Sequence, residues 1–269
     1  DLMLAEFPEH FEAVRGQSPV AVLRDSLAIA RAQQHETLQL RMSLALELLG
    51  EPVDQLPHVS LDNIAAASGA VLLATVDRER VVNPELALVA AERVLDLNPW
   101  GLFAADAWKA VAELSAAGGD TMKAIGAWRH LAENFPTSAH ASVARLREGD
   151  MQRQRGAHTA AITAYREVLK VRQWRGEAWA EANYKIGLTH FESGDYSAAF
   201  GFCQRVYVLY GGVERWAAEA YLTSGLSLEA LDRTSDAVAT YEELLSTESL
   251  RDESAAKAAA EKLEALRLS

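Results

Sequence analysis

The feature that most constrains the fold is a small residue that recurs at a nearly constant interval. Within the 269 residues, alanines stand 37 or 38 positions apart, at Ala87, Ala124, Ala161, Ala199 and Ala237. Twelve positions before each alanine comes another residue, and it is glycine in three units: Gly149, Gly187 and Gly225. Ala112 and Thr75 take this place in the earlier units. Such an interval indicates stacked units, each of which buries its apolar face against its neighbours.

Each recurring alanine is followed by mostly bulky apolar residues at the fourth and seventh positions. The fourth residues are Ala91, Trp128, Tyr165, Cys203 and Tyr241, and the seventh are Val94, Leu131, Val168, Val206 and Leu244. Because this spacing falls on one face of a helix, the alanines are expected on the second helix of an antiparallel hairpin. The glycines then lie on the first helix, at the point where the two backbones approach. This arrangement predicts that Gly187 lies close to Ala199.

Turn signals separate the expected helices. Gly119-Asp120, Gly156 and Gly194-Asp195 stand between first and second helices, where a glycine ends one helix and an aspartate caps the next. Asn98-Pro99 and Phe135-Pro136 end second helices, because proline cannot continue a helix. The sequence therefore predicts hairpins with short turns.

These residues resemble the tetratricopeptide repeat (TPR) family. The residues that carry the resemblance are Trp108, Val111, Ala112, Ala124, Trp128 and Pro136 in one unit and Gly187, Gly194, Asp195, Tyr196 and Ala199 in another. The resemblance implies an all-α fold, a right-handed superhelix (α-solenoid) of antiparallel helix hairpins. Family units are usually about 34 residues long, so the units here are longer, and they are similar to those of bacterial cell-envelope relatives.

The expected organisation has three parts. Residues 61–251 hold five TPR-like units, and residues 252–269 form a C-terminal capping helix with Asp252 as its N-cap. Residues 1–60 are an N-terminal helical segment, a degenerate repeat with amphipathic helices over Val20–Ala32 and Thr37–Leu49. Leu4–Pro8 resembles the end of a second helix, Leu131–Pro136, so we expect the native protein to extend before Asp1.

Charge and composition restrict the partners. The net charge is −12, from 26 Lys and Arg against 38 Asp and Glu, and an acidic surface repels nucleic acid. No run of apolar residues is long enough to predict a membrane span. The likeness to envelope proteins favours the bacterial periplasm or cell envelope over the cytoplasm, and no oligomeric state follows from the sequence.

The first helices of such hairpins line a concave groove. Counting from the glycine position, the inward-facing residues in the last two units are Glu181, Tyr184, Leu188, Phe191, Glu219, Leu222 and Leu226. Aromatic and aliphatic residues alternate here with acids. We therefore expect the groove to bind a protein or peptide with apolar anchors and basic flanks. The open alternatives are that the capping helix covers this patch, or that Tyr184 and Phe191 belong to the core.

No catalytic or cofactor-binding pattern is found in the sequence. There is no paired-cysteine or His-Glu-x-x-His metal spacing, and Cys203 falls on a core position. We expect a non-catalytic scaffold with no cofactor; the alternative is a regulatory or sensor segment of a larger bacterial signalling protein. Trp179 and Trp216 are expected to wedge between hairpins. Trp174 is the candidate for an exposed tryptophan, and the alternative is that it folds back onto the core.

Overall fold

The computed structural model describes residues 18–32, 39, 42–43, 45–46, 59–61, 64–67, 69–251 and 253–268. All regular secondary structure in this part of the chain is helical. The chain divides into two compact units, residues 1–118 and 119–269. The division falls in the turn of the hairpin that the sequence places around Ala112 and Ala124. Each unit is described by itself.

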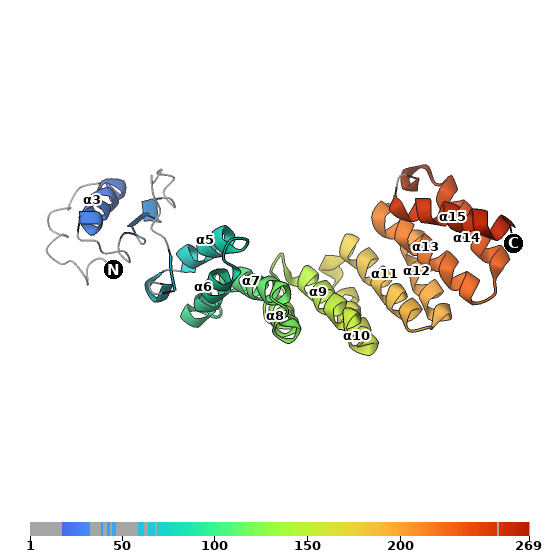
Figure 1. The fold of residues 1–269 in the computed structure, drawn as a ribbon, viewed down its shortest axis with the longest axis horizontal. Coiled ribbons are helices and arrows are strands. Elements are labelled where there is room, and N and C mark those ends of the chain that lie inside the picture. Colours follow the sequence, from blue (N-terminus) through green and yellow to red (C-terminus); the bar gives the residue numbers. More distant parts are fainter. Residues whose placement is uncertain are drawn as a thin grey trace. The chain divides into compact units, whose positions relative to one another are not determined.

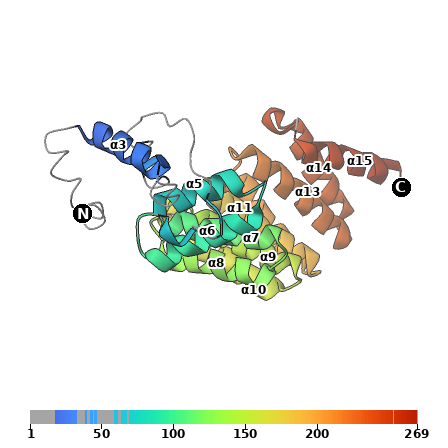
Figure 2. The same cartoon turned by 60° about the vertical axis from the view of Figure 1, so that its left-hand side comes forward.

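The first unit contains the helices up to residue 118. The elements whose bounds the structure describes are α3 (Pro19–Ala32), the short η1 (Ile64–Ala66), α5 (Gly69–Glu79), α6 (Pro84–Leu97) and α7 (Ala104–Ala117). Helix α5 packs on α6, and α6 packs on α7; Figure 2 shows the hairpin of α5 and α6 from a second direction.

Near the N-terminus, α3 covers the helix predicted over Val20–Ala32. Its Leu27 and Ala30 form a buried cluster with Met42 and Leu46, which are themselves helical. The side-chain amide of Gln39 donates to the Ala30 carbonyl oxygen over 3.1 Å. The described part of the expected Thr37–Leu49 helix therefore packs against α3, whereas Leu4–Pro8 lies outside the described residues.

The second unit is a continuous series of antiparallel helices. Each helix from α8 to α15 packs on the next one in the chain. The resemblance implied this arrangement, and the prediction of an all-α solenoid of hairpins is confirmed. Asp252, the expected cap of α15, lies outside the described residues. The elements are α8 (Thr121–Asn134), α9 (Ala141–Gln154), α10 (His158–Lys170), η2 (Arg172–Trp174), α11 (Glu177–Glu192), α12 (Tyr196–Leu209), α13 (Glu214–Ala230), α14 (Thr234–Ser246), η3 (Glu248–Leu250) and α15 (Ser254–Leu268).

The glycines of the first helices lie where each hairpin crosses. A Cβ atom built on Gly187 would stand 2.5 Å from the Cys203 sulfur and 3.2 Å from the carbonyl oxygen of Ala199. The predicted approach of Gly187 to Ala199 is therefore confirmed. At Gly149 and Gly225 the obstacle is instead a tyrosine ring of the second helix, from Tyr165 and Tyr241 respectively. In each case glycine makes room for the residue four positions after the recurring alanine.

The core follows the repeat. All five residues four positions after the alanines are buried, as are all five residues at the seventh position. Trp216 packs among Tyr184, Cys203 and Val206, and Trp179 packs against the cluster around Tyr165, so both predicted wedges are confirmed. Of the two alternatives for Trp174, the structure has the folded-back one, because the ring is half-buried and packs on this same cluster beside α10.

Capping aspartates and glycines with positive φ form the short turns between helices. Asp120 and Asp195 accept backbone N–H bonds from Lys123 and Ala198, at 3.0 and 3.2 Å. The three turn glycines Gly119, Gly156 and Gly194 all have positive φ, at 85°, 74° and 81°. In the turn from α13 to α14 the equivalent residue is Asp232, with φ 57°. A side chain in this left-handed region crowds its own backbone, so this turn is strained.

Replacement of Gly187 by alanine tests the crossing. We expect Gly187→Ala to lower the free energy of unfolding by about 2 kcal/mol, because the added methyl group overlaps Cys203 and the α12 backbone. Gly126→Ala is the matched control: this glycine is also helical, and a Cβ there meets nothing within 4 Å. That variant should gain about 0.5–1 kcal/mol from helix propensity. Urea denaturation of both proteins measures the difference, and equal stability of the two variants would contradict the crossing.

Replacement of Asp232 by glycine tests the strained turn. Asp232→Gly should raise the free energy of unfolding by about 1 kcal/mol, because glycine adopts positive φ without the steric cost. The converse change, Gly194→Ala, should lower it by a similar amount. Thermal melts of both variants measure the direction of each change in stability. A lower melting temperature for Asp232→Gly would show that the aspartate side chain stabilises the turn by more than the positive φ destabilises it.

Candidate partner-binding face

First helices of consecutive hairpins contact one another in the second unit. Helix α11 packs on α9, α13 packs on α11, and α15 packs on α13, in addition to the contacts within each hairpin. No contact of the same extent joins the second helices α10, α12 and α14 in the described part of the chain. One side of this unit is therefore lined by first helices, and their side chains are the ones available to a partner along it.

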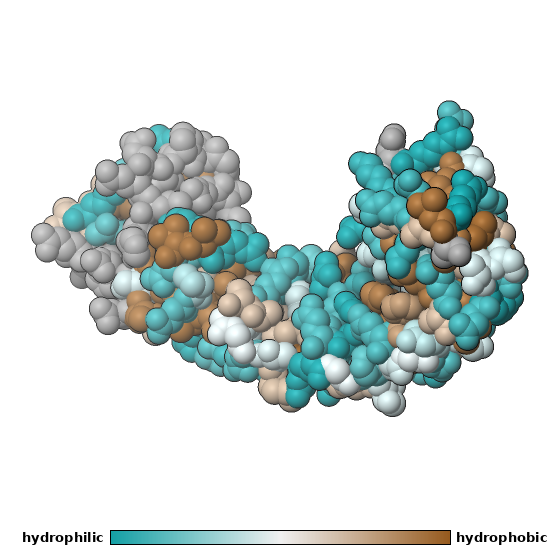
Figure 3. Space-filling view, turned by 45° about the vertical axis from the view of Figure 1, so that its right-hand side comes forward, coloured by the Kyte–Doolittle hydropathy of each residue, from teal (hydrophilic) through white to brown (hydrophobic). Residues whose placement is uncertain are grey.

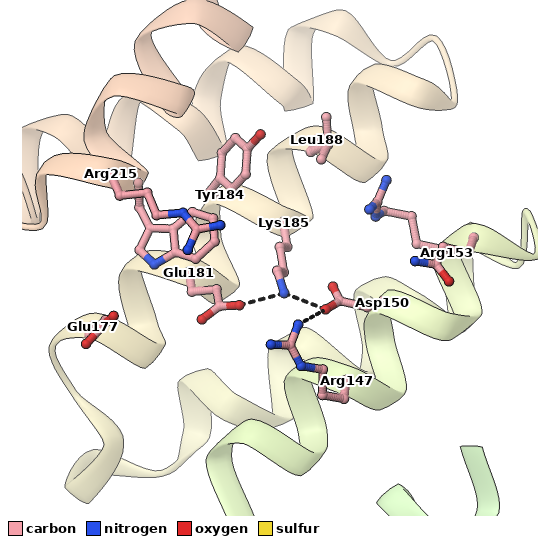
Figure 4. Close-up of a pocket in the computed structure, with 11 residues that line it drawn as sticks. Arg147, Asp150, Arg153, Glu177, Glu181, Tyr184, Lys185, Leu188 and Arg215 are labelled. Atoms are coloured by element: carbon pink, nitrogen blue, oxygen red, sulfur yellow. Dashed lines mark hydrogen bonds and ion pairs between the residues drawn. The ribbon is translucent and has the colours of Figure 1, made fainter. Parts of the chain in front are cut away.

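A hollow of about 430 Å³ opens on this side between α9, α11 and α13 (Figure 4). Its wall combines a few apolar side chains with many charged ones. The lining residues are Arg147, Asp150, Arg153, Gln154, Glu177, Glu181, Tyr184, Lys185, Leu188, Arg215 and Trp216.

Three of the predicted groove residues line this hollow: Glu181, Tyr184 and Leu188. Tyr184 is only 8% exposed, and its ring stacks on Trp216 with 5.4 Å between ring centroids. Its hydroxyl donates to a carboxylate oxygen of Glu219 over 3.3 Å. Burial, and then the charge of Glu219, raises the pKa of the Tyr184 hydroxyl. Tyr184 is thus part of the packing between α11 and α13 as well as of the wall.

The other predicted residues lie apart from the lining of the hollow. Phe191 is half-buried and meets Tyr196 edge-on, with 5.5 Å between ring centroids. Leu222 is half-buried and packs on the cluster that includes residues of α15, and Leu226 is half-buried on α13. The structure therefore brings Glu181, Tyr184, Leu188 and Glu219 together, and places the remaining three on the same pair of first helices.

A buried lysine that the sequence analysis missed, Lys185, lies at the floor of the hollow and pairs there with Asp150 and Glu181. The Lys185 ammonium lies 2.7 Å from a carboxylate oxygen of Asp150 and 2.6 Å from one of Glu181, and its side chain is 8% exposed. Asp150 also accepts from the Tyr165 hydroxyl over 2.8 Å and from Arg147 over 3.0 Å. Lys185 therefore ties α11 to α9, across the boundary between two hairpins. No pattern in the sequence marks this pair, because Lys185 and Asp150 lie in different hairpins and Lys185 is on another face of α11 than Gly187.

Arginines stand around the hollow. Arg147 and Arg153 come from α9 and Arg215 from α13, and their guanidinium groups lie on different sides of it in Figure 4. Arg215 lies over the Trp216 ring, 4.6 Å from its centroid. Arg153 forms an ion pair with Glu192 of α11. Charged residues thus outnumber apolar ones in the lining, whereas the sequence predicted aromatic and aliphatic residues alternating with acids.

The first unit has a smaller depression of its own, of about 340 Å³, between α5 and α7. Arg80 and Lys109 both pair with Glu113, at 2.7 and 3.4 Å. Asp77 and Asp106 also line it, so its carboxylates outnumber its cations. This depression is acidic, in contrast to the hollow of the second unit.

The described residues offer little for catalysis. Cys203 is fully buried, and burial raises the pKa of its thiol, so the reactive thiolate is disfavoured. Within the described ranges, no three His, Cys, Asp or Glu side chains gather in a way that could hold a metal ion. None of the helices described has the length and apolar character needed to cross a membrane.

The surface of the described chain is mostly hydrophilic on the face drawn in Figure 3, with hydrophobic residues in small separate areas. The most exposed large apolar side chains are Leu102, Val81 and Val82, which belong to turns of the first unit. A hydrophilic surface with a net charge of −12 favours recognition through local charge and shape.

Known proteins with similar features support the class of the fold. A family model described as "Tetratricopeptide repeat" matches residues 219–248, from within α13 to the start of η3. The solved structure of MamA is similar with a TM-score of 0.55 at 19% identity, over 68% of this chain and 93% of MamA. BtubC (BKLC) from P. vanneervenii has a TM-score of 0.55 at 12% identity, with 91% of each chain covered. No curated protein matches the sequence.

A third solved structure is PilW, described as a widely conserved type IV pilus biogenesis factor. Its TM-score is 0.50 at 14% identity, over 86% of this chain and 97% of PilW. At such identities the likeness concerns the fold alone. Stacked antiparallel hairpins with small residues at their crossings define a helical-repeat protein. The matched repeat at residues 219–248 and the shared architecture show that the chain has a tetratricopeptide-repeat type of fold.

Removal of the buried ammonium tests the floor of the hollow. Lys185→Met should lower the free energy of unfolding by about 3 kcal/mol, because it leaves Asp150 and Glu181 without their shared cation. Lys170→Met is the matched control, since this lysine pairs with Glu167 on the surface, where an ion pair contributes less than about 1 kcal/mol. Chemical denaturation at neutral pH measures both, and a loss below about 1 kcal/mol in Lys185→Met would show that the network is dispensable.

Proposed function

We propose that this protein is a non-catalytic scaffold that binds a segment of a partner protein along the face formed by its first helices. The observation that carries the proposal is the hollow between α9, α11 and α13, on the side where consecutive first helices meet. In repeat proteins of this kind, successive units together form an extended binding surface, because each unit contributes one helix to it. The family match and the fold shared with MamA and PilW support the same reading.

Apolar anchors of the partner would contact half-buried side chains of α11 and α13. Leu188 lines the hollow, and Phe191 and Leu222 are half-buried on the same two helices. Tyr184 is too buried to contact a partner over much of its surface. Its part in binding is to pack against Trp216 and Leu188 and hold them in position. A preformed surface of this kind binds without the entropic cost of ordering its side chains.

Basic flanks of the partner would find carboxylates in the first unit. The depression between α5 and α7 carries three carboxylates against two cations, and both cations already pair with Glu113. In the second unit Glu181 is engaged by Lys185, and Glu219 by Tyr184. The depression of the first unit is therefore proposed as a site of its own for basic groups of a partner.

The bacterial cell envelope is the proposed setting. Support comes from the length of the units, 37 or 38 residues, and from the likeness to PilW, which is described as a pilus biogenesis factor. Fractionation of cells that express the natural gene tests this setting, since recovery of the protein in the cytoplasmic fraction would overturn it.

Selection from a library of random peptides tests binding directly. We expect the 269-residue protein to enrich a family of related peptides with an apolar core. Leu188→Gln combined with Phe191→Gln should weaken their binding at least tenfold, because both apolar contacts are lost. Fluorescence anisotropy of labelled peptides measures the affinities.

Leu209→Gln is the control for this test. Leu209 is 66% exposed at the end of the second helix α12, so its change should leave peptide affinity unaltered. Circular dichroism melts establish that the paired variant stays folded. Failure of any peptide family to enrich, or equal weakening by the Leu209 control, would count against a scaffold that binds along the first helices.

A further inference from the structure

The end of α10 and the turn that follows it carry a local excess of positive charge. The carboxylates of this stretch are Glu167, which pairs with Lys170 over 2.6 Å, and Glu177, which begins α11. The chain as a whole has 26 Lys and Arg against 38 Asp and Glu, so the sign of this stretch is the reverse of the overall one. The exposed cations lie within residues 166–175 and are Arg166, Lys170, Arg172 and Arg175.

The three arginines of this stretch keep their donors available. Among the described residues, no ion pair to Arg166, Arg172 or Arg175 is found. The Arg175 guanidinium lies over the Trp179 ring, 5.9 Å from its centroid. Trp174 and Trp179 both pack on the core of the second unit. The turn is therefore fixed to the core while its arginines are exposed.

Helix α12, in the next hairpin, adds a further cation to this surface. Arg205 is exposed and lies over the Phe202 ring, 4.7 Å from its centroid. Phe202 packs on the same core cluster as Trp174 and Trp179. Arginines from two successive hairpins thus stand over aromatic rings of one cluster.

Aliphatic side chains are exposed beside these cations. Val208 and Leu209 lie one turn after Arg205 on α12, and each is 66% exposed. Val208 stands 38 positions after Lys170, so the two residues occupy equivalent places on consecutive second helices. Cations and exposed apolar side chains therefore adjoin on one surface of the second unit.

We propose that this surface, the basic edge, docks on a bilayer that contains anionic lipids. Near such a bilayer each Lys or Arg strengthens binding by about fivefold, and aliphatic side chains add to it by entering the headgroup region. The proposal goes beyond the scaffold function, because the basic edge belongs to second helices and a turn and not to the first-helix side. Its members are Arg166, Lys170, Arg172, Arg175, Arg205, Val208 and Leu209.

The negative charge of the remaining chain favours one orientation on the bilayer. A net charge of −12 is repelled by anionic lipids wherever carboxylates predominate, and the basic edge is attracted. The protein would then lie with the ends of α10 and α12 toward the lipid.

A bilayer fits the basic edge better than a nucleic acid does. Proteins that bind single-stranded nucleic acid stack its bases on aromatic side chains. Here the Trp174 and Trp179 rings pack on the core, and the large exposed apolar residues, Val208 and Leu209, have no aromatic face. Aliphatic side chains gain from contact with lipid and little from contact with phosphate.

Binding to vesicles tests the proposal. The 269-residue protein should float with phosphatidylcholine vesicles that contain about 30% phosphatidylglycerol, and should stay in solution with phosphatidylcholine alone, because only the first surface is anionic. Raising the salt from about 0.1 M to about 0.5 M should release the protein, since the shorter Debye length screens the arginines. Flotation over a series of lipid concentrations gives the apparent affinity.

Paired variants separate the charged part of the basic edge from the apolar part. Arg172→Gln with Arg175→Gln should weaken vesicle binding by at least about tenfold, whereas the same pair changed to lysine should bind within about twofold of the unchanged protein. Val208→Gln with Leu209→Gln should weaken it by about fivefold and keep its salt dependence, because the cations remain.

Arg155→Gln with Arg233→Gln is the matched control. Both arginines are exposed in turns that join a first helix to its second helix, at the other end of the hairpins from η2. This pair removes the same amount of charge as the Arg172 and Arg175 pair, and it should leave vesicle binding within about twofold. Circular dichroism melts establish that each variant stays folded.

Several outcomes would overturn the basic edge. They are absence of flotation with the anionic vesicles, equal losses in the two glutamine pairs of arginines, and a lysine pair that binds as weakly as the glutamine pair. Tighter binding to a single-stranded DNA oligonucleotide than to the vesicles would show a nucleic-acid site and would also overturn it. Leu188→Gln with Phe191→Gln should float like the unchanged protein, so the scaffold function and the basic edge can fail independently.

Discussion

The structure depends on the close approach of two helices within each hairpin. At Gly187 the first helix comes so near to α12 that a Cβ atom would overlap Cys203 and the backbone of Ala199. Glycine has no side chain to oppose this contact, so the residues around it pack densely. At Gly149 and Gly225 the missing side chain leaves room for tyrosine rings of the second helix. The interval between these positions is the length of the repeating unit.

The stack in turn creates the candidate binding face. Because first helices pack on first helices, side chains from α9, α11 and α13 meet on one side of the second unit. The buried ion pairs of Lys185 bridge α9 and α11 there. Replacing a buried ionic network by well-packed apolar side chains is often neutral or stabilising in proteins, whereas removal of one partner is costly. The hollow is therefore a product of the same contacts that join the units.

The two units differ in the charge that they offer. The depression of the first unit has an excess of carboxylates, and the hollow of the second unit has an excess of cations.

The sequence by itself determined the hairpins, their crossings and most of their caps. The recurring Ala199 and Gly187, the caps at Asp120 and Asp195 and the burial of Cys203 all follow from local spacing, because helix geometry relates residues less than one unit apart. Only the tertiary structure decided that Trp174 packs on the core and that Tyr184 stacks on Trp216. It also decided the pairing of Lys185 with Asp150, which stand 35 positions apart in neighbouring hairpins. Periodicity gives the face on which such a side chain lies. The partner that it meets depends on how the next hairpin packs, and that depends on the shapes of all the side chains between them.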